Sequence, residues 1–399
     1  MFNSLKFKVI LFGFIFTFFS SFGQSYFLGL FNSSIREALS ITHGQFGSIY
    51  ASATLCSSLL LIWVGKKIDD VNIFKFAFFV TILLSFACFF FSKISSVFLL
   101  FVAIFLMRFS GQGMMSHTAS TTISRYFTRG RALSISWFGL SSAEFIMPVL
   151  MVYLLTIIDW KNLWLIFSLT VLIVLPVTSF LLIKNLNLDS REASDEDKKD
   201  VEIKQWKRRE VIKDYRFYII SSNMLAMPWI FTGFAVFQSF VQTSKGWGPY
   251  VIAQSFMSYS IFSVLTLFLS GFLIDKFTSR KLLIYMNIPL LLSVVVLFFF
   301  DTPIAAFIFL GLVGISNGFA NILGSSTWAE LYGVKYLGSI KALTTALMVF
   351  ATAFGTALFG FLIDKGFTVG DIAIVSGSYI YVSLILLFFV RKKLNPVII

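Results

Sequence analysis

Two charged residues, Arg108 and Glu144, lie inside long apolar stretches of the sequence. Arg108 precedes and Glu144 follows a basic loop at residues 125–131, at similar separations along the chain. If both stretches cross a membrane as helices, a rise of about 1.5 Å per residue places both side chains roughly 20 Å from the same membrane face. A midplane arginine costs at least about 2.5–3.5 kcal/mol, so we expect it to face protein or water and to have a partner. Glu144 is the obvious one.

The pair has two interpretations, and the sequence leaves both open. In the first, Arg108 and Glu144 form a structural ion pair that holds two neighbouring helices together. In the second, Arg108 neutralises an anionic substrate while Glu144 carries a coupling proton. The two can overlap, since one pair can break when a substrate arrives. His117 lies half a turn out of phase with Arg108, so we expect it to pack or to anchor a loop rather than to relay protons.

The composition indicates that most of the chain faces lipid. Hydrophobic residues make up 57% of the 399 residues and charged residues 13%, and the mean hydropathy is +0.87. A water-soluble chain of this length needs far more surface charge. The net charge of +13 occurs in short clusters between apolar runs, as in membrane proteins, so we expect no nucleic-acid partner.

The apolar runs predict an all-α membrane protein with twelve transmembrane helices. About 20 apolar residues cross the hydrocarbon core as a helix, which satisfies its own backbone there. The predicted spans are residues 9–31, 45–64, 72–92, 97–120, 132–157, 162–183, 217–242, 250–273, 282–300, 303–327, 339–362 and 371–390.

A charged segment divides the chain between its sixth and seventh spans. Residues 184–216 contain too few apolar side chains for a domain core and read as a linker, partly helical. We therefore predict an N-terminal six-helix half at 1–183, the linker at 184–216 and a C-terminal six-helix half at 217–399.

The distribution of basic residues predicts the orientation. With the N-terminus inside, sixteen Lys and Arg fall on inner segments before the linker is counted. Five fall on outer segments: Arg36, Lys93, Lys161, Lys245 and Lys365. By the positive-inside rule both termini and the linker are cytoplasmic, in a bacterial-type inner membrane.

A repeated dipeptide predicts two similar halves. Ile-Asp occurs only at Ile68-Asp69, Ile158-Asp159, Ile274-Asp275 and Ile363-Asp364. These positions close predicted helices 2, 5, 8 and 11, two on the inside and two on the outside. This is the pattern of two parallel six-helix halves, each built from two inverted three-helix units.

Two inner loops carry a family resemblance. The loop after helix 2 contains Gly65 and then Asp69, and the loop after helix 8 contains Gly271, Asp275 and Arg280. Both resemble the signature loop of the major facilitator superfamily, in which a helix-end carboxylate pairs with basic groups and holds one conformation. The resemblance implies twelve helices in two pseudo-symmetric halves and assigns these five residues to a conformational latch. It also implies secondary transport by alternating access.

A third loop resembles one particular group within the superfamily. Residues 125–134 (RYFTRGRALS) resemble the loop between helices 4 and 5 of monocarboxylate and oxalate/formate-type members. The Gly-Pro antiporter signature expected in helix 5 is absent, because Met147 precedes Pro148. The loop after helix 2 also departs from the family pattern beyond Asp69, where residues 71–74 are uncharged.

The family's cavity is lined by helices 1, 4, 7 and 10, and this sequence has polar residues in all four. Residues four apart share a helix face. The resemblance therefore implies a substrate site at Arg108, Gln112, Gln24, Gln238, Asn317 and Asn321, with Glu144 as the proton-coupling residue. Each amide is equally explained as an interhelical hydrogen bond of about 0.6 kcal/mol.

The leading hypothesis is a proton- or cation-coupled carrier of a small organic anion such as a monocarboxylate, acting as a monomer without a cofactor. The alternative is an exporter of a hydrophobic or cationic compound, with Glu144 as the cation site. An integral-membrane enzyme is a remote alternative, because the sequence contains no metal cluster, nucleophile motif or cofactor fingerprint.

Overall fold

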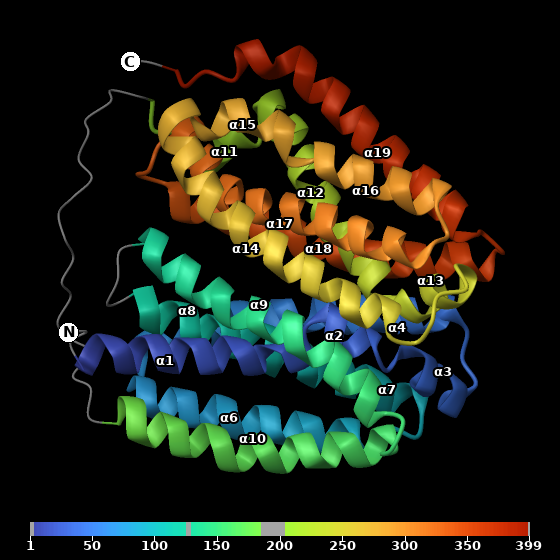
Figure 1. Cartoon of the computed structure of the whole chain (residues 1–399). Coiled ribbons are helices and arrows are strands. Elements are labelled where there is room, and N and C mark those ends of the chain that lie inside the picture. The colour runs from blue at the N-terminus through green and yellow to red at the C-terminus, as the bar shows by residue number, and fades with distance from the viewer. Residues whose placement is uncertain (1–3, 125–128, 185–203, 398–399) are drawn as a thin grey trace. The chain divides into compact units, whose positions relative to one another are not determined.

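Helices form all the regular secondary structure in the described part of the chain. The computed structural model describes residues 4–124, 129–184 and 204–397. No strand occurs in these ranges (Figure 1). The predicted all-α class is confirmed.

The twelve predicted spans match the helices in order. Over the described residues, eleven helical stretches are long and apolar enough to cross a membrane, and the shorter apolar helix Phe138–Leu154 corresponds to the predicted fifth span. Helices suit this setting because they satisfy their own backbone groups in lipid. The fold is therefore a twelve-helix membrane bundle.

The helices of the first half include two spans that are interrupted rather than continuous. The first span is divided into α1, η1 and α2, and the fourth into α7, the π-helical η2 and α8. In chain order the elements are α1 (Ser4–Phe19), η1 (Ser20–Gly23), α2 (Ser25–Gly29), α3 (Asn32–Leu39), α4 (His43–Val64), α5 (Lys67–Asp70), α6 (Ile73–Phe91), α7 (Val97–Met107), η2 (Arg108–Met115), α8 (Ser116–Ser124), α9 (Arg129–Leu154) and α10 (Trp160–Ile183).

The second half also has interrupted spans, at its first and third helices. Its elements are α11 (Arg208–Val211), α12 (Tyr215–Val236), α13 (Gln238–Ser244), α14 (Val251–Phe277), α15 (Ser279–Met286), α16 (Ile288–Phe299), α17 (Pro303–Tyr332), α18 (Leu337–Asp364), α19 (Val369–Val390) and η3 (Arg391–Lys393). Pro289 directly follows the start of α16, where its missing N–H costs no helical hydrogen bond.

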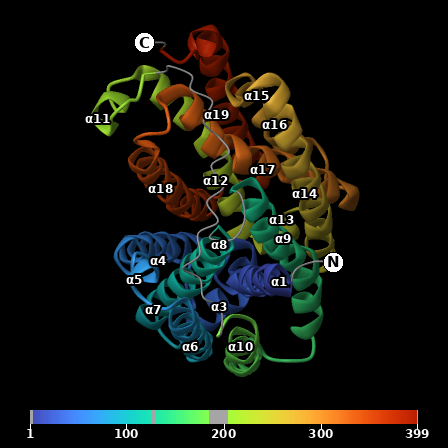
Figure 2. The same ribbon diagram turned by 90° about the vertical axis from the view of Figure 1, so that its left-hand side faces the viewer.

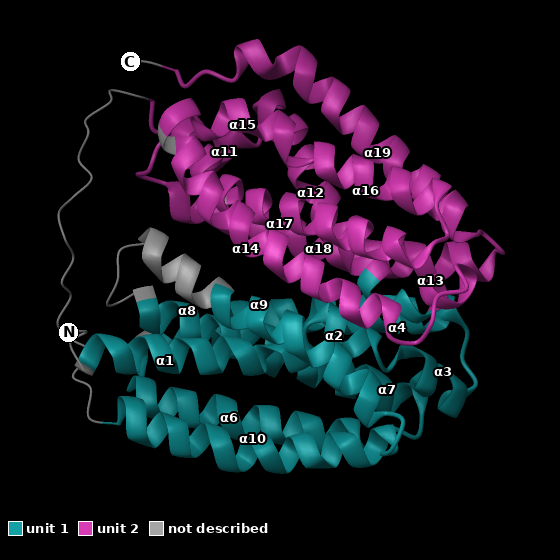
Figure 3. Ribbon diagram, in the orientation of Figure 1, with its two compact units in different colours: residues 1–195, 235–239 teal, residues 196–234, 240–399 magenta. Residues whose placement is uncertain are grey.

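The chain separates into two compact units, shown in Figure 3. Unit 1 comprises residues 1–195 and 235–239, and unit 2 comprises residues 196–234 and 240–399. The short piece 235–239, between α12 and α13, thus belongs to the unit of the N-terminal helices. One boundary, at residues 195/196, falls within the predicted linker, and the other two fall inside the predicted C-terminal half.

Within unit 1, α6 and α10 lie side by side at one edge of the bundle (Figure 1 and Figure 2). A reciprocal pair of hydrogen bonds joins them. Ser85 Oγ donates to the Ser168 carbonyl at 2.9 Å, and Ser168 Oγ donates to the Ser85 carbonyl at 2.9 Å. Hydroxyl groups in lipid-facing bundles need such partners because no water reaches them.

The repeated Ile-Asp dipeptides stand at or near helix ends. Asp364 is the last residue of α18, and Asp159 is the N-cap of α10, where its carboxylate accepts the Lys161 N–H at 2.9 Å. Asp70, next to Asp69, ends the short α5. Asp275 lies two residues before the end of α14.

Candidate functional site

The guanidinium of Arg108 is buried in unit 1 and tied to the first span. Only 2% of Arg108 is exposed. Its Nη1 donates to the Gly23 carbonyl at 3.0 Å and to Ser25 Oγ at 3.2 Å. Both acceptors flank Gln24, whose extended backbone (φ −80°, ψ 151°) breaks the helix between η1 and α2. The break leaves the Gly23 carbonyl available to a side chain, since a continuous helix would use it internally.

Tyr50 of α4 supports the same guanidinium from a second side. Its ring centroid lies 5.4 Å from Arg108 Cζ, within cation–π range. Its hydroxyl donates to Ser25 Oγ at 3.0 Å. Tyr50 therefore contacts the cation directly and also holds the serine that the cation uses.

One edge of the guanidinium has no hydrogen-bond partner within the described part of the chain. Among the described residues, Nε has no hydrogen-bond partner although it is buried, and none is found for Nη2 either. Nε–H and Nη2–H point in parallel along one side of the planar group. That side is the fork that grips the two oxygens of a carboxylate or phosphate.

Two glycines allow the close crossing that places Arg108. A side chain at Gly23 would collide with the Met107 carbonyl and the Gln112 N–H, and one at Gly111 would come within 2.6 Å of the Gly23 nitrogen. The crossing point on the fourth span is the π-helical η2, which begins at Arg108. π-Helical turns inside longer helices are frequent at functional sites.

Glu144 of α9 is a second buried charge, but it does not pair with Arg108 in this structure. Only 4% of Glu144 is exposed, and its Oε2 has no hydrogen-bond partner among the described residues. Within that part of the chain no ion pair of 4.0 Å or less joins it to Arg108. The expected ion pair is therefore replaced by the contacts of Arg108 with Gly23 and Ser25.

Gln24 and Gln112 belong to the two segments that meet at Arg108. Gln24 lies between the two acceptors of Arg108, and Gln112 lies in η2 beside Gly23. Both side chains are half-buried. Arg108, Gln24 and Gln112 therefore lie on the two segments of unit 1 that cross at Gly23 and Gly111.

The Gln238 side chain forms hydrogen bonds with backbone carbonyls. Its Nε2 donates to the Tyr26 carbonyl at 2.7 Å and to the Ala235 carbonyl at 2.9 Å. Nearby, Asn32 Nδ2 donates to the Val236 carbonyl at 2.8 Å. These bonds attach residues 235–239 to the first span, so the Gln238 amide serves as an interhelical hydrogen bond in this structure.

Asn317 and Asn321 belong to α17 in unit 2. Asn317 Nδ2 donates to Ser263 Oγ of α14 at 2.9 Å, which is the interhelical bond that the sequence left as an alternative. Nδ2 of the half-buried Asn321 has no hydrogen-bond partner among the described residues.

The signature loops are described in part. Gly65 caps α4, and His117 Nε2 lies 3.0 Å from its carbonyl, so His117 anchors this loop as the sequence indicated. Arg280 Nε lies 3.9 Å from Glu330 Oε2. A side chain at Gly271 would meet nothing within 4 Å.

Some predicted positions lie outside the described part. The side chains of Asp69 and Asp275 are not among the described residues, and the same holds for residues 125–128 of the loop between helices 4 and 5. The latch assignment therefore stays a prediction for both carboxylates.

Sequence reasoning missed Tyr50, Ser25 and Gly23 as partners of Arg108. Tyr50 and Ser25 lie in apolar runs where each reads as an ordinary packing residue. The break at Gln24 carries no proline or glycine–proline signal. The described residues contain no group of three or more His, Cys, Asp or Glu that could hold a metal ion.

Comparison with solved structures shows the fold. A bacterial homologue of the human lysosomal transporter Spinster, in an inward-facing and unoccupied conformation, matches with a TM-score of 0.73 and 14% identity over 98% of each chain. The nucleoside transporter NupG matches with a TM-score of 0.68 and 14% identity, also over 98% of each chain. No curated protein sequence matches this chain.

Comparison with family models shows the family. The model described as Major Facilitator Superfamily matches residues 13–356. It supports the superfamily but not the monocarboxylate or oxalate/formate subtype that the sequence suggested. The structural neighbours are transporters rather than enzymes. This chain therefore belongs to the Major Facilitator Superfamily of membrane transporters.

Proposed function

We propose that this transporter carries a small organic anion, such as a monocarboxylate, by proton- or cation-coupled alternating access. The observation that supports the proposal is the Nε/Nη2 edge of Arg108: Nε is buried without a hydrogen-bond partner, and no hydrogen bond of Nη2 is found in the described part of the chain. A charge buried in a membrane protein without its full set of partners is costly and marks a substrate or ion site by default.

The contacts of Arg108 suit an anion site better than a structural pair. Gly23, Ser25 and Tyr50 are uncharged, so they orient the guanidinium without neutralising it. A carboxylate on the open edge would add two charge-assisted hydrogen bonds and supply the missing counter-charge. Gln24 and Gln112 are the proposed contacts for the rest of a small substrate.

Glu144 is the proposed proton carrier. Its buried carboxyl lacks a partner for Oε2, and protonation removes the cost of holding an unpaired charge away from water. Binding of an anion at Arg108 would strengthen the attraction for a proton nearby. The coupled movement of one proton with one anion follows from this electrostatic link.

The membrane arrangement is part of the proposal. Both termini and the linker are placed in the cytoplasm of a bacterial-type cell, and the protein acts as a monomer in its inner membrane. The support is the excess of basic residues on one set of loops.

The test is substrate binding to purified protein. Radiolabelled small carboxylates would be screened in proteoliposomes, and the best ligand would then be measured against Arg108→Gln and Arg108→Lys. We expect Gln to abolish binding and Lys to restore it in part, since an ammonium grips a carboxylate as a point charge. Unchanged binding by Arg108→Gln would refute the anion site.

One observation also favours the alternative, an exporter of a hydrophobic or cationic compound. Glu144 is a buried carboxyl with no basic partner within 4.0 Å among the described residues. A cationic substrate would bind there. In that case Glu144→Gln would abolish binding while Arg108→Gln would leave it intact, which is the reverse of the first proposal.

A further inference from the structure

Two basic segments lie at the end of unit 2 that carries the C-terminus. Lys207, Arg208 and Arg209 stand at the start of α11, and residues 391–393 (Arg-Lys-Lys) form η3. All six side chains are exposed, as is that of Lys213. In Figure 1, α11 and the end of α19 lie at the same end of the unit. We call these seven residues the basic surface.

Hydrogen bonds between the linker end and the C-terminal tail connect the two segments. Arg216 Nη1 donates to the Lys393 carbonyl at 3.3 Å and to the Asn395 carbonyl at 2.8 Å. The Lys204 N–H donates to the Val397 carbonyl at 2.8 Å. The Arg216 side chain and one backbone hydrogen bond therefore tie the linker end to residues more than 170 positions later in the sequence.

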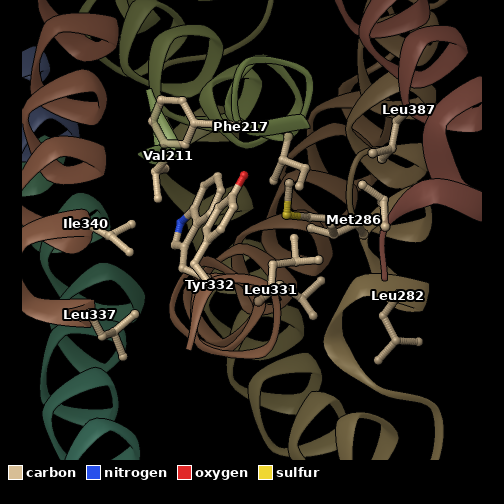
Figure 4. Close-up of a cluster of buried hydrophobic side chains, with 14 residues drawn as sticks. Val211, Phe217, Leu282, Met286, Leu331, Tyr332, Leu337, Ile340 and Leu387 are labelled. Carbon is tan, nitrogen blue, oxygen red and sulfur yellow. The ribbon is translucent and has the colours of Figure 1, made fainter. Parts of the chain in front are cut away.

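An apolar cluster lies beneath these bonds. Val211 of α11 and Leu394 of the tail are almost fully buried in one cluster with Phe217, Leu331 and Tyr332. Figure 4 shows Val211, Leu331 and Tyr332 in this cluster. Burial of large apolar side chains on both segments fixes their backbones. The exposed cations therefore project from backbone segments that this apolar cluster holds in place.

The acidic side chains described at this end are already engaged. Asp214 Oδ2 lies 2.7 Å from Arg216 Nη2, and Glu330 accepts the Ser279 N–H at 2.8 Å beside Arg280. Glu210 Oε1 lies 2.8 Å from Lys204 Nζ. That hydrogen bond lowers the pKa of Glu210, which keeps the carboxylate charged and engaged with Lys204. Within the described part of the chain, no ion pair of 4.0 Å or less joins these carboxylates to the seven cations of the basic surface; the contact between the two sets is at Lys207, whose N–H donates to Glu210 Oε2 at 2.8 Å.

The basic surface adjoins the level at which the helices enter the bilayer. Tyr215, the first residue of α12, is 51% exposed, and Tyr218, one turn later, is 55% exposed. Exposed tyrosines at the end of a transmembrane helix belong to the interfacial belt of membrane proteins. Lys213 and α11 directly precede Tyr215, so their charges lie at headgroup depth.

We propose that the basic surface binds the headgroup of an anionic phospholipid. Clusters of four to eight Lys or Arg next to a transmembrane helix attract anionic lipid, at about 1 kcal/mol per charge near the surface. Arginine and lysine donors from two directions suit the oxygens of a lipid phosphate. The positive-inside rule accounts for the sign of these charges. It does not explain why cations from the start and from the end of the C-terminal half are held together by one apolar cluster.

The experiment titrates purified full-length protein in neutral detergent with dioctanoyl phosphatidylglycerol or dioctanoyl phosphatidylcholine. The rise in Tm with lipid concentration gives an apparent Kd. We expect the phosphatidylglycerol to bind more tightly than the phosphatidylcholine. Arg208→Gln/Arg209→Gln should weaken it about 30-fold, and Lys392→Gln/Lys393→Gln by a similar factor.

Two controls keep the test decisive. Lys6→Gln/Lys8→Gln removes the same charge from exposed positions of α1 in unit 1 and should leave the Kd unchanged. Arg208→Lys/Arg209→Lys keeps the charge and should retain binding, which separates lost charge from damaged folding.

Three outcomes would overturn the proposal. Equal weakening by Lys6→Gln/Lys8→Gln would show an effect of net charge alone. A loss confined to one of the two segments would show that they do not form one surface. Displacement of the lipid by an equal concentration of inorganic phosphate would assign the surface to free anions.

Discussion

The Nη1 group of Arg108 donates to the backbone carbonyl of Gly23 at 3.0 Å, across the crossing of the first and fourth membrane spans. This bond joins an irregular point of each span, the break after η1 and the π-helical η2. It fixes one side of the guanidinium and leaves the Nε/Nη2 edge open.

Tyr50 is predicted to position Arg108 for the anion. Tyr50→Phe removes the hydroxyl that holds Ser25, a loss of about 1 kcal/mol, and should weaken anion binding about fivefold. Tyr50→Leu also removes the cation–π contact and should weaken it roughly 100-fold. The matched control is Tyr379→Phe, which loses a 2.8 Å bond to the Ser222 carbonyl in unit 2. If it weakens binding as much as Tyr50→Phe does, Tyr50 has only a structural role.

The glycine contact between the two spans is predicted to be essential. Gly111→Ala places a methyl group against Gly23, and this overpacking costs about 1–3 kcal/mol. We expect it to displace the Gly23 carbonyl and to reduce anion affinity roughly tenfold. Gly338→Ala is the control, because nothing lies within 4 Å of its added methyl group. Anion binding and uptake are measured for both variants. Equal affinities of the two variants would contradict a role for the glycine contact.

Glu144 is predicted to couple transport to protons without being needed for exchange. Glu144→Gln mimics the protonated carboxyl, so counterflow exchange of labelled anion should continue at a similar rate. Accumulation driven by a pH gradient should fall to the level of equilibration. The double variant Arg108→Gln/Glu144→Gln should be inactive. Normal transport by that variant would move the search for the site to the amides of helices 1, 7 and 10.

The two signature carboxylates are predicted to contribute unequally. Asp275→Asn should reduce transport roughly tenfold while leaving expression and substrate binding largely intact, because it shifts a conformational equilibrium. Asp69→Asn should do less, since its loop lacks the usual basic run. Transport rates and binding constants measured in parallel test this. Small and equal effects would show that both loops are only surface turns without a latch role.

The proposed orientation is tested with reporters at Ile399. A fluorescent-protein fusion there should be bright and an alkaline-phosphatase fusion inactive, because the C-terminus is placed inside. The opposite pattern would reverse the topology. It would also invalidate the depth assigned to Arg108 and Glu144.

The sequence by itself determined the membrane class, the twelve helices and the special status of Arg108 and Glu144. These properties follow from local composition, because a run of apolar residues long enough to cross lipid does so as a helix. A charged residue inside such a run can likewise be recognised from its immediate neighbours, because a charge in lipid is costly and therefore rare. The repeated Ile-Asp dipeptides are also visible in the sequence alone, because they recur at the ends of predicted helices.

Only the tertiary structure decided which groups each side chain meets. The sequence paired Arg108 with Glu144 by depth, but depth does not fix the direction in which a side chain points. The break at Gln24 exposed the Gly23 carbonyl, and the glycine crossing brought it to Arg108. Gln238 read as a cavity residue, yet its amide bonds the backbone of α2. Such contacts depend on helix crossings between distant segments, and no spacing within one segment encodes them.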